Sequence, residues 1–519
     1  MPRVETKVER KVEQGPEGSL PDPASVINLR LAVPLALLAI VFMLAVQQCA
    51  SLDPDLWWHL QTGKDIVASR SIPHVDPYSF TKAGAAWITH EWLSEVLMFG
   101  VYRLSGLGGL VFIFSAVITS AFLIVYRQCA MQPYVAGLAA LLGAMSATPL
   151  FGIRPQMITL LLASVYIAVL RRFTRSGEAR ALWWLPPLMI LWVNLHAGFA
   201  LGLGLIGLFF VSCVLDRNWK LLRPLVLTGL ACAVVVPLNP NAFRLFLYPL
   251  QTLTSPSMAA LIDEWSSPDF HQPMFLPLAV FLFASFAALA LSPRRPRPGE
   301  LFLLLVTTFG ALRSARHIPI FALVAAPIFA QQLAELLKAR GWDRGLTRAT
   351  TATGGSVALS FMLIVAPLGL AVFQFWRFVT RQETYVSARI PKAAVDFIQT
   401  QHLPGPIYNR YGWGGYLIFR LYPEYRVYVD GRADVYGDDF LFEMVNTYDG
   451  RSGWREPLER YGVRTALISP DVPLASLLRM DPGWLKVYED KQAVIFTRVQ
   501  SPVSSVQRPT SAGPEGERK

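Results

Sequence analysis

The sequence has few charged residues and few cysteines. Only 16% of its 519 residues are charged, whereas about a quarter is typical of a soluble globular protein. Its four cysteines show no C-x-x-C spacing, so they support neither a zinc site nor a disulfide framework. These shortages exclude an ordinary soluble enzyme and a small disulfide-rich domain.

The sequence is instead rich in apolar residues. The chain is 53% hydrophobic and has a mean hydropathy of +0.38. Its apolar runs of about 15–22 residues are long enough to cross the hydrocarbon core of a bilayer. We therefore expect a polytopic α-helical membrane protein with about eleven transmembrane helices, near residues 31–50, 107–126, 134–151, 156–171, 181–195, 197–215, 223–238, 276–292, 299–312, 317–337 and 354–378.

The net charge of +11 does not indicate a nucleic-acid partner, because the Arg and Lys residues lie in short clusters between apolar runs. Such clusters set the orientation of membrane helices. With the N-terminus in the cytoplasm, four basic clusters, at 171–175, 217–223, 294–297 and 338–348, all fall on the cytoplasmic side. The orientation predicts a multi-pass protein of the inner membrane whose C-terminus is periplasmic.

The composition changes again after the last apolar run. Short β-like segments alternate with helical patterns there, which is typical of a small α/β domain. We expect a cytoplasmic N-terminal tail (1–30), a transmembrane domain (31–378) with outer loops at 51–106 and 239–275, a periplasmic α/β domain (383–499) and a disordered tail (500–519).

The first outer loop opens with acidic residues beside a histidine, in the string Asp53-Pro54-Asp55-Leu56-Trp57-Trp58-His59. Asp followed by Pro is typical of an N-cap and the first helical position, so capping alone explains Asp53. Asp55 falls in the first turn, where the helix dipole favours a carboxylate. His59 lies four residues later, on the same helix face as Asp55.

More acid and imidazole groups follow near predicted helix ends on the outer side. They are His90 and Glu91 in the same loop, and His196 between two apolar runs. Acid and imidazole side chains can act as a general base or bind a divalent cation. No cofactor follows firmly from these spacings, and hydrogen bonding between helices is the alternative explanation for His196.

In this arrangement the chain resembles the GT-C superfamily of integral-membrane glycosyltransferases. A first span is followed by an outer loop with acidic residues, many spans and an outer C-terminal domain. The string from Asp53 to His59 also resembles the first loop of an uncharacterised bacterial family of membrane proteins. The resemblance implies a polyprenyl-phosphate-linked sugar donor and a catalytic first-loop carboxylate, for which Asp55 is the first candidate, Asp53 the second and Glu91 the third.

Three arginines on the outer side are candidates for binding the donor phosphate. Arg313 and Arg316 run against the positive-inside trend, and Arg154 precedes Pro155 at the outer start of a span. Arginine forms forked hydrogen bonds to phosphate oxygens. The alternative is that these side chains anchor the helices among lipid headgroups.

The C-terminal domain contains a glycine-rich turn around Trp413, which predicts an exposed ring. Asp430 and Arg432 follow in a second short motif. These residues could contact an acceptor, or could form a domain turn with a buried Asp–Arg pair. The acceptor itself stays unknown.

The leading hypothesis is therefore a membrane glycosyltransferase that acts on the outer face of the inner membrane. A transporter or flippase of a lipid-linked glycan is one alternative, but it would need charges near the bilayer midplane. A non-catalytic envelope assembly protein is another.

Overall fold

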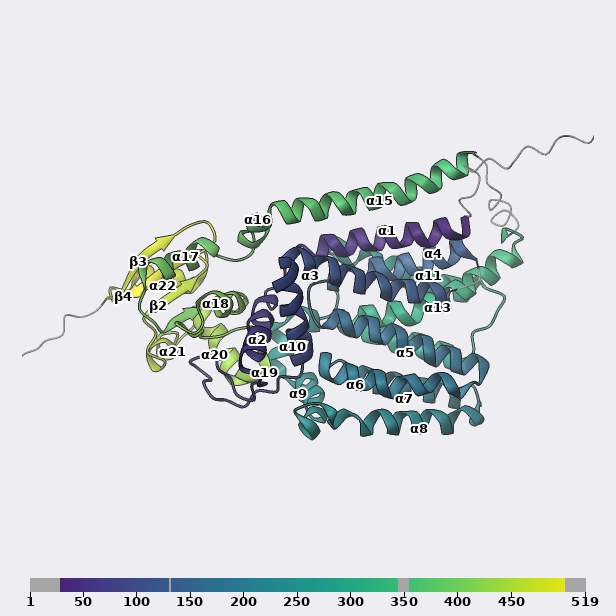
Figure 1. Ribbon diagram of the computed structural model, residues 1–519, viewed down its shortest axis with the longest axis horizontal. Helices are drawn as coiled ribbons and strands as arrows, with labels where there is room; N and C mark the ends of the chain where they lie inside the picture. The colour runs from purple at the N-terminus through teal and green to yellow at the C-terminus, as the bar shows by residue number, and fades with distance from the viewer. Residues whose placement is uncertain (1–28, 130–131, 344–353, 500–519) are drawn as a thin grey trace, which may run out of the picture.

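The computed structural model describes residues 29–129, 132–343 and 354–499. The predicted disordered tail and almost all of the predicted N-terminal tail lie outside these residues. The described chain is mostly helical, with one small sheet near its C-terminal end (Figure 1).

A helix coincides with each of the eleven predicted spans. These helices are α1 (Leu29–Cys49), α3 (Trp92–Gln128), α4 (Pro133–Ala147), α5 (Gln156–Ser176), α6 (Leu185–Leu195), α7 (Phe199–Leu215), α8 (Leu222–Val234), α11 (Leu276–Leu291), α12 (Pro298–Arg313), α13 (Ile318–Ala339) and α15 (Gly354–Thr380). Within the described residues, eight helical segments are long and apolar enough to cross a membrane. The other three spans, α6, α7 and α12, are shorter helices of 11, 17 and 16 residues. The chain is thus a multi-pass membrane protein.

Helix α3 joins the second span to a helix of the first outer loop. Its backbone departs from helical geometry at Gly106, where φ is 62° and ψ is −160°. Only glycine adopts such a conformation without steric cost. The break lets residues before it pack against α2 (Leu56–Ser69) while those after it enter the bundle.

The second outer loop is also largely helical. It contains α9 (Tyr248–Thr254) and α10 (Pro256–Leu261). The Ser255 hydroxyl caps α10 by accepting a hydrogen bond from the Met258 N–H. Ser255 and Ser257 donate hydrogen bonds to Asp438 at 2.6 and 2.5 Å, so this loop is tied to the C-terminal domain.

The C-terminal domain contains a four-stranded sheet of order β1-β2-β4-β3. Strands β1 and β2 are parallel, and β4 is antiparallel to both β2 and β3. The strands are β1 (Ile407–Asn409), β2 (Thr465–Ile468), β3 (Trp484–Glu489) and β4 (Val494–Arg498). The helices are α16 (Gln382–Ser387), α17 (Lys392–Gln401), α18 (Gly414–Leu421), α19 (Ala433–Tyr436), α20 (Asp438–Tyr448), α21 (Arg455–Arg460) and α22 (Pro473–Met480).

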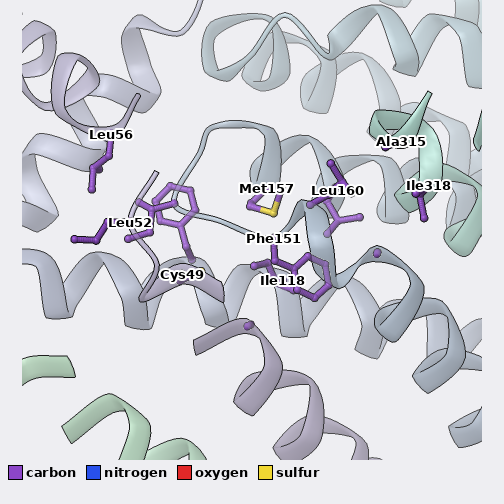
Figure 2. Packing of buried hydrophobic residues seen from close by; sticks show 14 of the residues in the cluster. Cys49, Leu52, Leu56, Ile118, Phe151, Met157, Leu160, Ala315 and Ile318 are labelled. Carbon is purple, nitrogen blue, oxygen red and sulfur yellow. The ribbon is translucent and has the colours of Figure 1, made fainter. Parts of the chain in front are cut away.

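A cluster of apolar side chains packs where the first outer loop meets α3, α5 and α13 (Figure 2). Its members come in pairs that flank charged residues in the sequence. The pairs are Leu52 and Leu56 around the Asp53–Asp55 segment, Phe151 and Met157 around Arg154, and Ala315 and Ile318 around Arg316. Because each pair is buried, the charged residues between them are brought to one end of the bundle.

Candidate active site

A polar cavity of about 610 Å³ lies between the ends of the helices and the C-terminal domain. The loop before α2, the start of α3 and the residues before α5 form one side of it. The α6–α7 loop, the second outer loop, the start of α13 and two turns of the C-terminal domain complete the wall. Nine residues predicted from the sequence line this one cavity: Asp53, Asp55, His59, His90, Glu91, Arg154, His196, Arg316 and Arg432.

Asp53 does not cap α2 as expected, because the helix begins later, at Leu56. One Asp53 carboxylate oxygen instead accepts a hydrogen bond from the Asp55 N–H at 2.8 Å. The other forms an ion pair with Arg154, whose guanidinium also pairs with Glu264. The two carboxylates raise the pKa of Arg154 despite the opposing effect of burial. Asp53 is therefore occupied by a local turn and an ion pair.

Asp55 lies beside Asp53 but forms no ion pair with any described residue. Burial and the neighbouring Asp53 carboxylate raise the pKa of Asp55 to about 6. A carboxylate with such a pKa is ionised at neutral pH and is a stronger base than an exposed aspartate. Of Asp53 and Asp55, Asp55 is the one that forms no ion pair with a described residue, so it is the better candidate to accept a proton.

The C-terminal domain touches Asp55 directly. A Cβ atom placed on Gly431 would lie 1.8 Å from Asp55 Oδ1. A Cβ atom on Gly415 would lie 2.7 Å from the Pro54 carbonyl oxygen. Glycine at these two positions lets the domain approach the first outer loop closely. The position of Asp55 therefore depends on a segment about 376 residues away in the sequence.

Three histidines surround Glu91. His90 Nε2 lies 2.7 Å from one Glu91 oxygen, His196 Nε2 lies 3.5 Å from the same oxygen, and His59 Nε2 lies 3.6 Å from the other. Although burial opposes ionisation, His90 holds the pKa of Glu91 well below its usual range, and Glu91 raises that of His90. Glu91 is thus an ion-paired carboxylate, which makes it a weaker base than Asp55.

His196 is the neutral member of the group. Its Nδ1 accepts a hydrogen bond from the Gly198 N–H at 2.9 Å. Burial lowers its pKa to about 3. A nitrogen that accepts a backbone N–H carries no proton of its own, so the geometry and the pKa agree. His196 therefore presents its Nε2–H toward Glu91.

Arg316 lines the cavity and Arg313 does not. The Arg316 guanidinium lies 4.9 Å from the centre of the Trp265 ring, and its Nε lies 4.0 Å from Glu264. Arg313 ends α12 with an exposed side chain. The two arginines predicted to bind one phosphate together are thus separated, because a turn directs only Arg316 inward.

The ring of Trp413 is buried and not exposed, so that prediction is wrong. It is only 3% exposed, and the Arg410 guanidinium lies 5.3 Å from its centre. Gly414 lets the turn pack tightly, because a Cβ atom there would lie 2.1 Å from the Val429 carbonyl oxygen. The glycine-rich turn therefore packs against the domain, and the Trp413 ring is buried.

Asp430 and Arg432 form a buried ion pair, at 2.7 Å between Oδ2 and Nη2. Arg432 also pairs with Asp76 of the first outer loop at 2.8 Å. The Asp430 pKa is lowered by Arg432, against the effect of burial. This Asp430–Arg432–Asp76 network joins the domain to the loop, which favours a structural role over contact with an acceptor.

Several cavity residues were missed as site candidates in the sequence. Asp434 and Tyr248 line the cavity, and the Tyr248 ring packs against His90 with 4.3 Å between ring centres. Burial raises the pKa of Asp434. Glu264 was not missed, because Asp263-Glu264-Trp265 in the second outer loop is a segment that the sequence suggests could cover this cavity, and all three residues line it. No local pattern singles out Tyr248.

The described residues contain no group of three or more His, Cys, Asp and Glu side chains that could hold a metal ion. The imidazoles around Glu91 contact its carboxylate oxygens.

A second, mostly apolar cavity of about 550 Å³ adjoins the first. It lies between α10, α20 and the turn around Trp413. Pro54, Met258 and Tyr411 are among the residues that line both cavities. The polar cavity thus lies next to a space suited to an apolar group.

No family model and no curated protein matches the sequence. Solved structures do match it. The oligosaccharyltransferase AglB of Archaeoglobus fulgidus, in complex with an inhibitory peptide and a dolichol-phosphate, is 14% identical with a TM-score of 0.53 over 92% of this chain and 75% of its own. ArnT of Cupriavidus metallidurans, bound to undecaprenyl phosphate, is 16% identical with a TM-score of 0.51 over 95% of this chain and 100% of its own.

The arabinofuranosyltransferase AftD from Mycobacteria is also similar, with 13% identity and a TM-score of 0.51 over 92% of this chain and 40% of its own. All three matches extend over both the helical bundle and the C-terminal part of this chain. At such low identity the likeness concerns the fold. This chain has the fold of the GT-C integral-membrane glycosyltransferases.

Proposed function

We propose that the chain is a glycosyltransferase that moves a sugar from a polyprenyl-phosphate donor to an acceptor hydroxyl, with Asp55 as the base. The observation that carries this proposal is the state of Asp55. It is a carboxylate without a salt bridge to a described residue, in a polar cavity next to an arginine-held aspartate, and its pKa is raised to about 6. Such a group suits proton abstraction from a hydroxyl.

The reaction is a single displacement. The acceptor oxygen attacks the anomeric carbon while the bond from that carbon to the phosphate oxygen breaks. The acceptor proton passes to the Asp55 carboxylate, and polyprenyl phosphate leaves with the bonding electrons. The configuration of the anomeric centre is inverted.

Arg316 and Arg154 are the groups we assign to the leaving phosphate. Both line the cavity that contains Asp55. Cations fixed where negative charge develops stabilise a transition state without reorganisation. Arg316 has the weaker carboxylate contact, at 4.0 Å from Glu264, so a phosphate can displace that contact most readily.

The solved relatives support this class of donor. AglB was solved with a dolichol-phosphate and ArnT with undecaprenyl phosphate. Both lipids are polyprenyl-type phosphates, so a polyprenyl-phosphate-linked sugar is the donor class we propose for this chain. The donor sugar and the acceptor stay open.

The direction in which the cavity faces follows from the basic clusters. Arg171–Arg175 end α5, and the 294–297 cluster precedes α12, whereas the cavity lies at the other ends of these helices. The positive-inside rule places such clusters in the cytoplasm. We therefore propose that the site faces the periplasm.

The test is transfer by the purified chain in detergent, supplied with a panel of polyprenyl-phosphate sugars and hydroxyl acceptors. We expect release of polyprenyl phosphate together with a glycosylated acceptor. A flippase would move a labelled lipid-linked glycan across reconstituted vesicles without cleaving it. Transport without release, or neither activity with any donor, would contradict the proposal.

A further inference from the structure

A second charged cavity lies at the opposite end of the helical bundle from Asp55. Its volume is about 580 Å³, and α3, α5 and α13 form its walls. On α5, fifteen residues separate Gln156, at the polar cavity, from Arg171, at this one. A helix rises 1.5 Å per residue, so the two cavities are about 22 Å apart along it. In Figure 1 this end of α5 points away from the C-terminal domain.

Four arginines line this basic cavity, and no carboxylate does. Arg127, Arg172 and Arg175 are exposed at its rim, whereas Arg171 is only 7% exposed. Of the four, only Arg172 forms an ion pair with a described residue, an exposed contact of 3.7 Å to Glu178. The cavity thus carries a positive charge that the described protein does not neutralise.

Two of its lining side chains have buried polar atoms without a partner. The Arg171 Nε and both amide atoms of Gln128 form no hydrogen bond among the described residues. A buried polar atom of a charged group that lacks a hydrogen bond is costly, since burial removes its hydration without replacing it. Orientation in the membrane explains exposed arginines at helix ends, but it does not explain a buried one that faces a cavity.

We infer that this basic cavity binds a phosphate group, supplied by the headgroup of an anionic phospholipid. Arginine and amide donors around one space suit the several oxygens of a phosphate. The cavity also has apolar walls, at Ala168 on α5 and Pro327 on α13. Basic pockets between transmembrane helices are typical sites for acidic headgroups. The inference does not depend on which chemistry Asp55 performs.

The test uses the full chain, stripped of lipid in a neutral detergent and titrated with dioctanoyl phosphatidylglycerol. Binding is followed by native mass spectrometry and by the melting temperature. We expect phosphatidylglycerol to raise the melting temperature of the wild type. Arg171→Gln should weaken this binding at least about tenfold, the effect of losing a charge-assisted contact. Arg223→Gln, an exposed arginine of another basic cluster, is the matched control and should bind within about twofold of wild type.

The stability of Arg171→Gln gives a second readout. Without lipid, this variant should melt at or above the wild-type temperature, because an unpaired buried charge has been removed. With saturating phosphatidylglycerol the order should reverse. If Arg171→Gln does not fold, Arg175→Gln at the exposed rim is expected to weaken binding several-fold.

Dioctanoyl phosphatidylcholine and inorganic phosphate identify the source of the phosphate. If only phosphatidylglycerol raises the melting temperature, the bound phosphate is that of a lipid headgroup. Equal protection by inorganic phosphate supports the phosphate site but assigns it to a soluble ligand. Wild-type affinity in both Arg171→Gln and Arg175→Gln, or equal protection by the zwitterionic lipid, would overturn the inference.

Discussion

At the scale of single residues, the first outer loop places two carboxylates side by side in different states. Asp53 forms a salt bridge with Arg154, whereas Asp55 forms none with a described residue, although Arg154 and His59 act to lower its pKa. Burial and Asp53 both disfavour the ionised form of Asp55. Of the two, Asp53 is therefore the structural carboxylate and Asp55 the reactive one. Neighbouring titratable groups in active sites often differ in this way.

Replacing Asp55 with Asn should abolish most of the transfer activity and leave the fold intact. The change keeps the size of the side chain but removes the base, whose loss costs about 10²–10⁴-fold in rate. The measurement is the rate of sugar transfer by purified protein. Asp269→Asn, on an exposed outer-loop aspartate away from the cavity, is the matched control and should keep its activity. A transfer rate of Asp55→Asn within a few-fold of wild type would move the base to Asp53 or Glu91.

The pH dependence of the rate should report the same carboxylate. Because the base must be ionised, the wild-type rate should fall as the pH drops through about 6, the pKa of Asp55. The residual rate of Asp55→Asn should lack this step between pH 5 and pH 7. A step that persists unchanged in the variant would assign the titration to another group.

The contribution of Asp55 to the stability of the fold should decrease as the pH rises, whereas the transfer rate should increase. The pKa of Asp55 in the folded state is raised from its ordinary value of 3.8 to about 6. Protonated Asp55 therefore stabilises the folded state. This stabilisation is fully present below pH 3.8 and is lost as the pH rises through about 6. Asp55→Asn should consequently melt at or above the wild-type temperature at pH 7 in a thermal unfolding scan. A marked loss of stability at pH 7 would contradict this account of the site.

At the scale of elements, the second outer loop supplies a carboxylate to the arginines of the site. Glu264 contacts both Arg154 and Arg316. The Ser314 hydroxyl donates a hydrogen bond to the Glu264 carbonyl oxygen at 2.9 Å, which fixes the loop to the end of α12. A donor phosphate entering the cavity must therefore compete with Glu264 for Arg316.

Glu264→Gln should accordingly lower the KM for the polyprenyl-phosphate donor. A partly exposed ion pair is worth up to about 1 kcal/mol, so removing the competing charge predicts about a fivefold decrease. Steady-state kinetics with varied donor measure it. The Arg316→Lys variant should raise the same KM, because lysine keeps the charge but loses the fork. A donor KM unchanged in both variants would place the phosphate elsewhere.

The C-terminal domain also approaches the first outer loop closely, and this contact positions Asp55. Gly431 lies against the Asp55 carboxylate, whereas Gly412, which also lines the cavity, has nothing within 4 Å of a Cβ position. Gly431→Ala should displace Asp55 and reduce the rate up to about 10²-fold, the cost of a misplacement near 1 Å. Gly412→Ala should leave the transfer rate unchanged. In the Asp55→Asn background, Gly431→Ala should have little further effect.

At the scale of the whole molecule, the polar cavity and the basic cavity lie at opposite ends of the same helices. The arginine-rich ends of the helices are grouped on one side, as the positive-inside rule expects of cytoplasmic ends. The C-terminal domain covers the other end and contributes to the polar cavity. A periplasmic site therefore requires a periplasmic C-terminal domain.

A reporter that is active only in the periplasm should be active when fused after Val499 and silent when fused near Ser176. Val499 directly follows β4, in the C-terminal domain, and Ser176 ends α5, at the end of that helix away from the polar cavity. The measurement is reporter activity in intact cells, with expression of both fusions checked by immunoblot. An active reporter near Ser176 would reverse the orientation and place Asp55 in the cytoplasm.

Elements with strong local patterns could be predicted from the sequence. Helix α17 spans Lys392–Gln401 as its periodicity indicates, and the α6–α7 break falls at His196. Apolar runs and helical periodicity involve neighbouring residues, so each segment carries its own signal. Basic clusters between such runs likewise indicate the orientation, and the first-loop string indicates a family resemblance.

The assembly of the site was decided by the tertiary structure. Arg154 pairs with Asp53 and Glu264, which lie 101 and 110 residues away, and Gly431 meets Asp55 across a longer separation. The same packing buries Trp413 and leaves Arg313 outside the cavity. The sequence by itself determined which residues could do chemistry and which segments cross the membrane. Only the packing of helices from distant parts of the chain decided which of those residues meet, because contacts over such separations leave no local pattern.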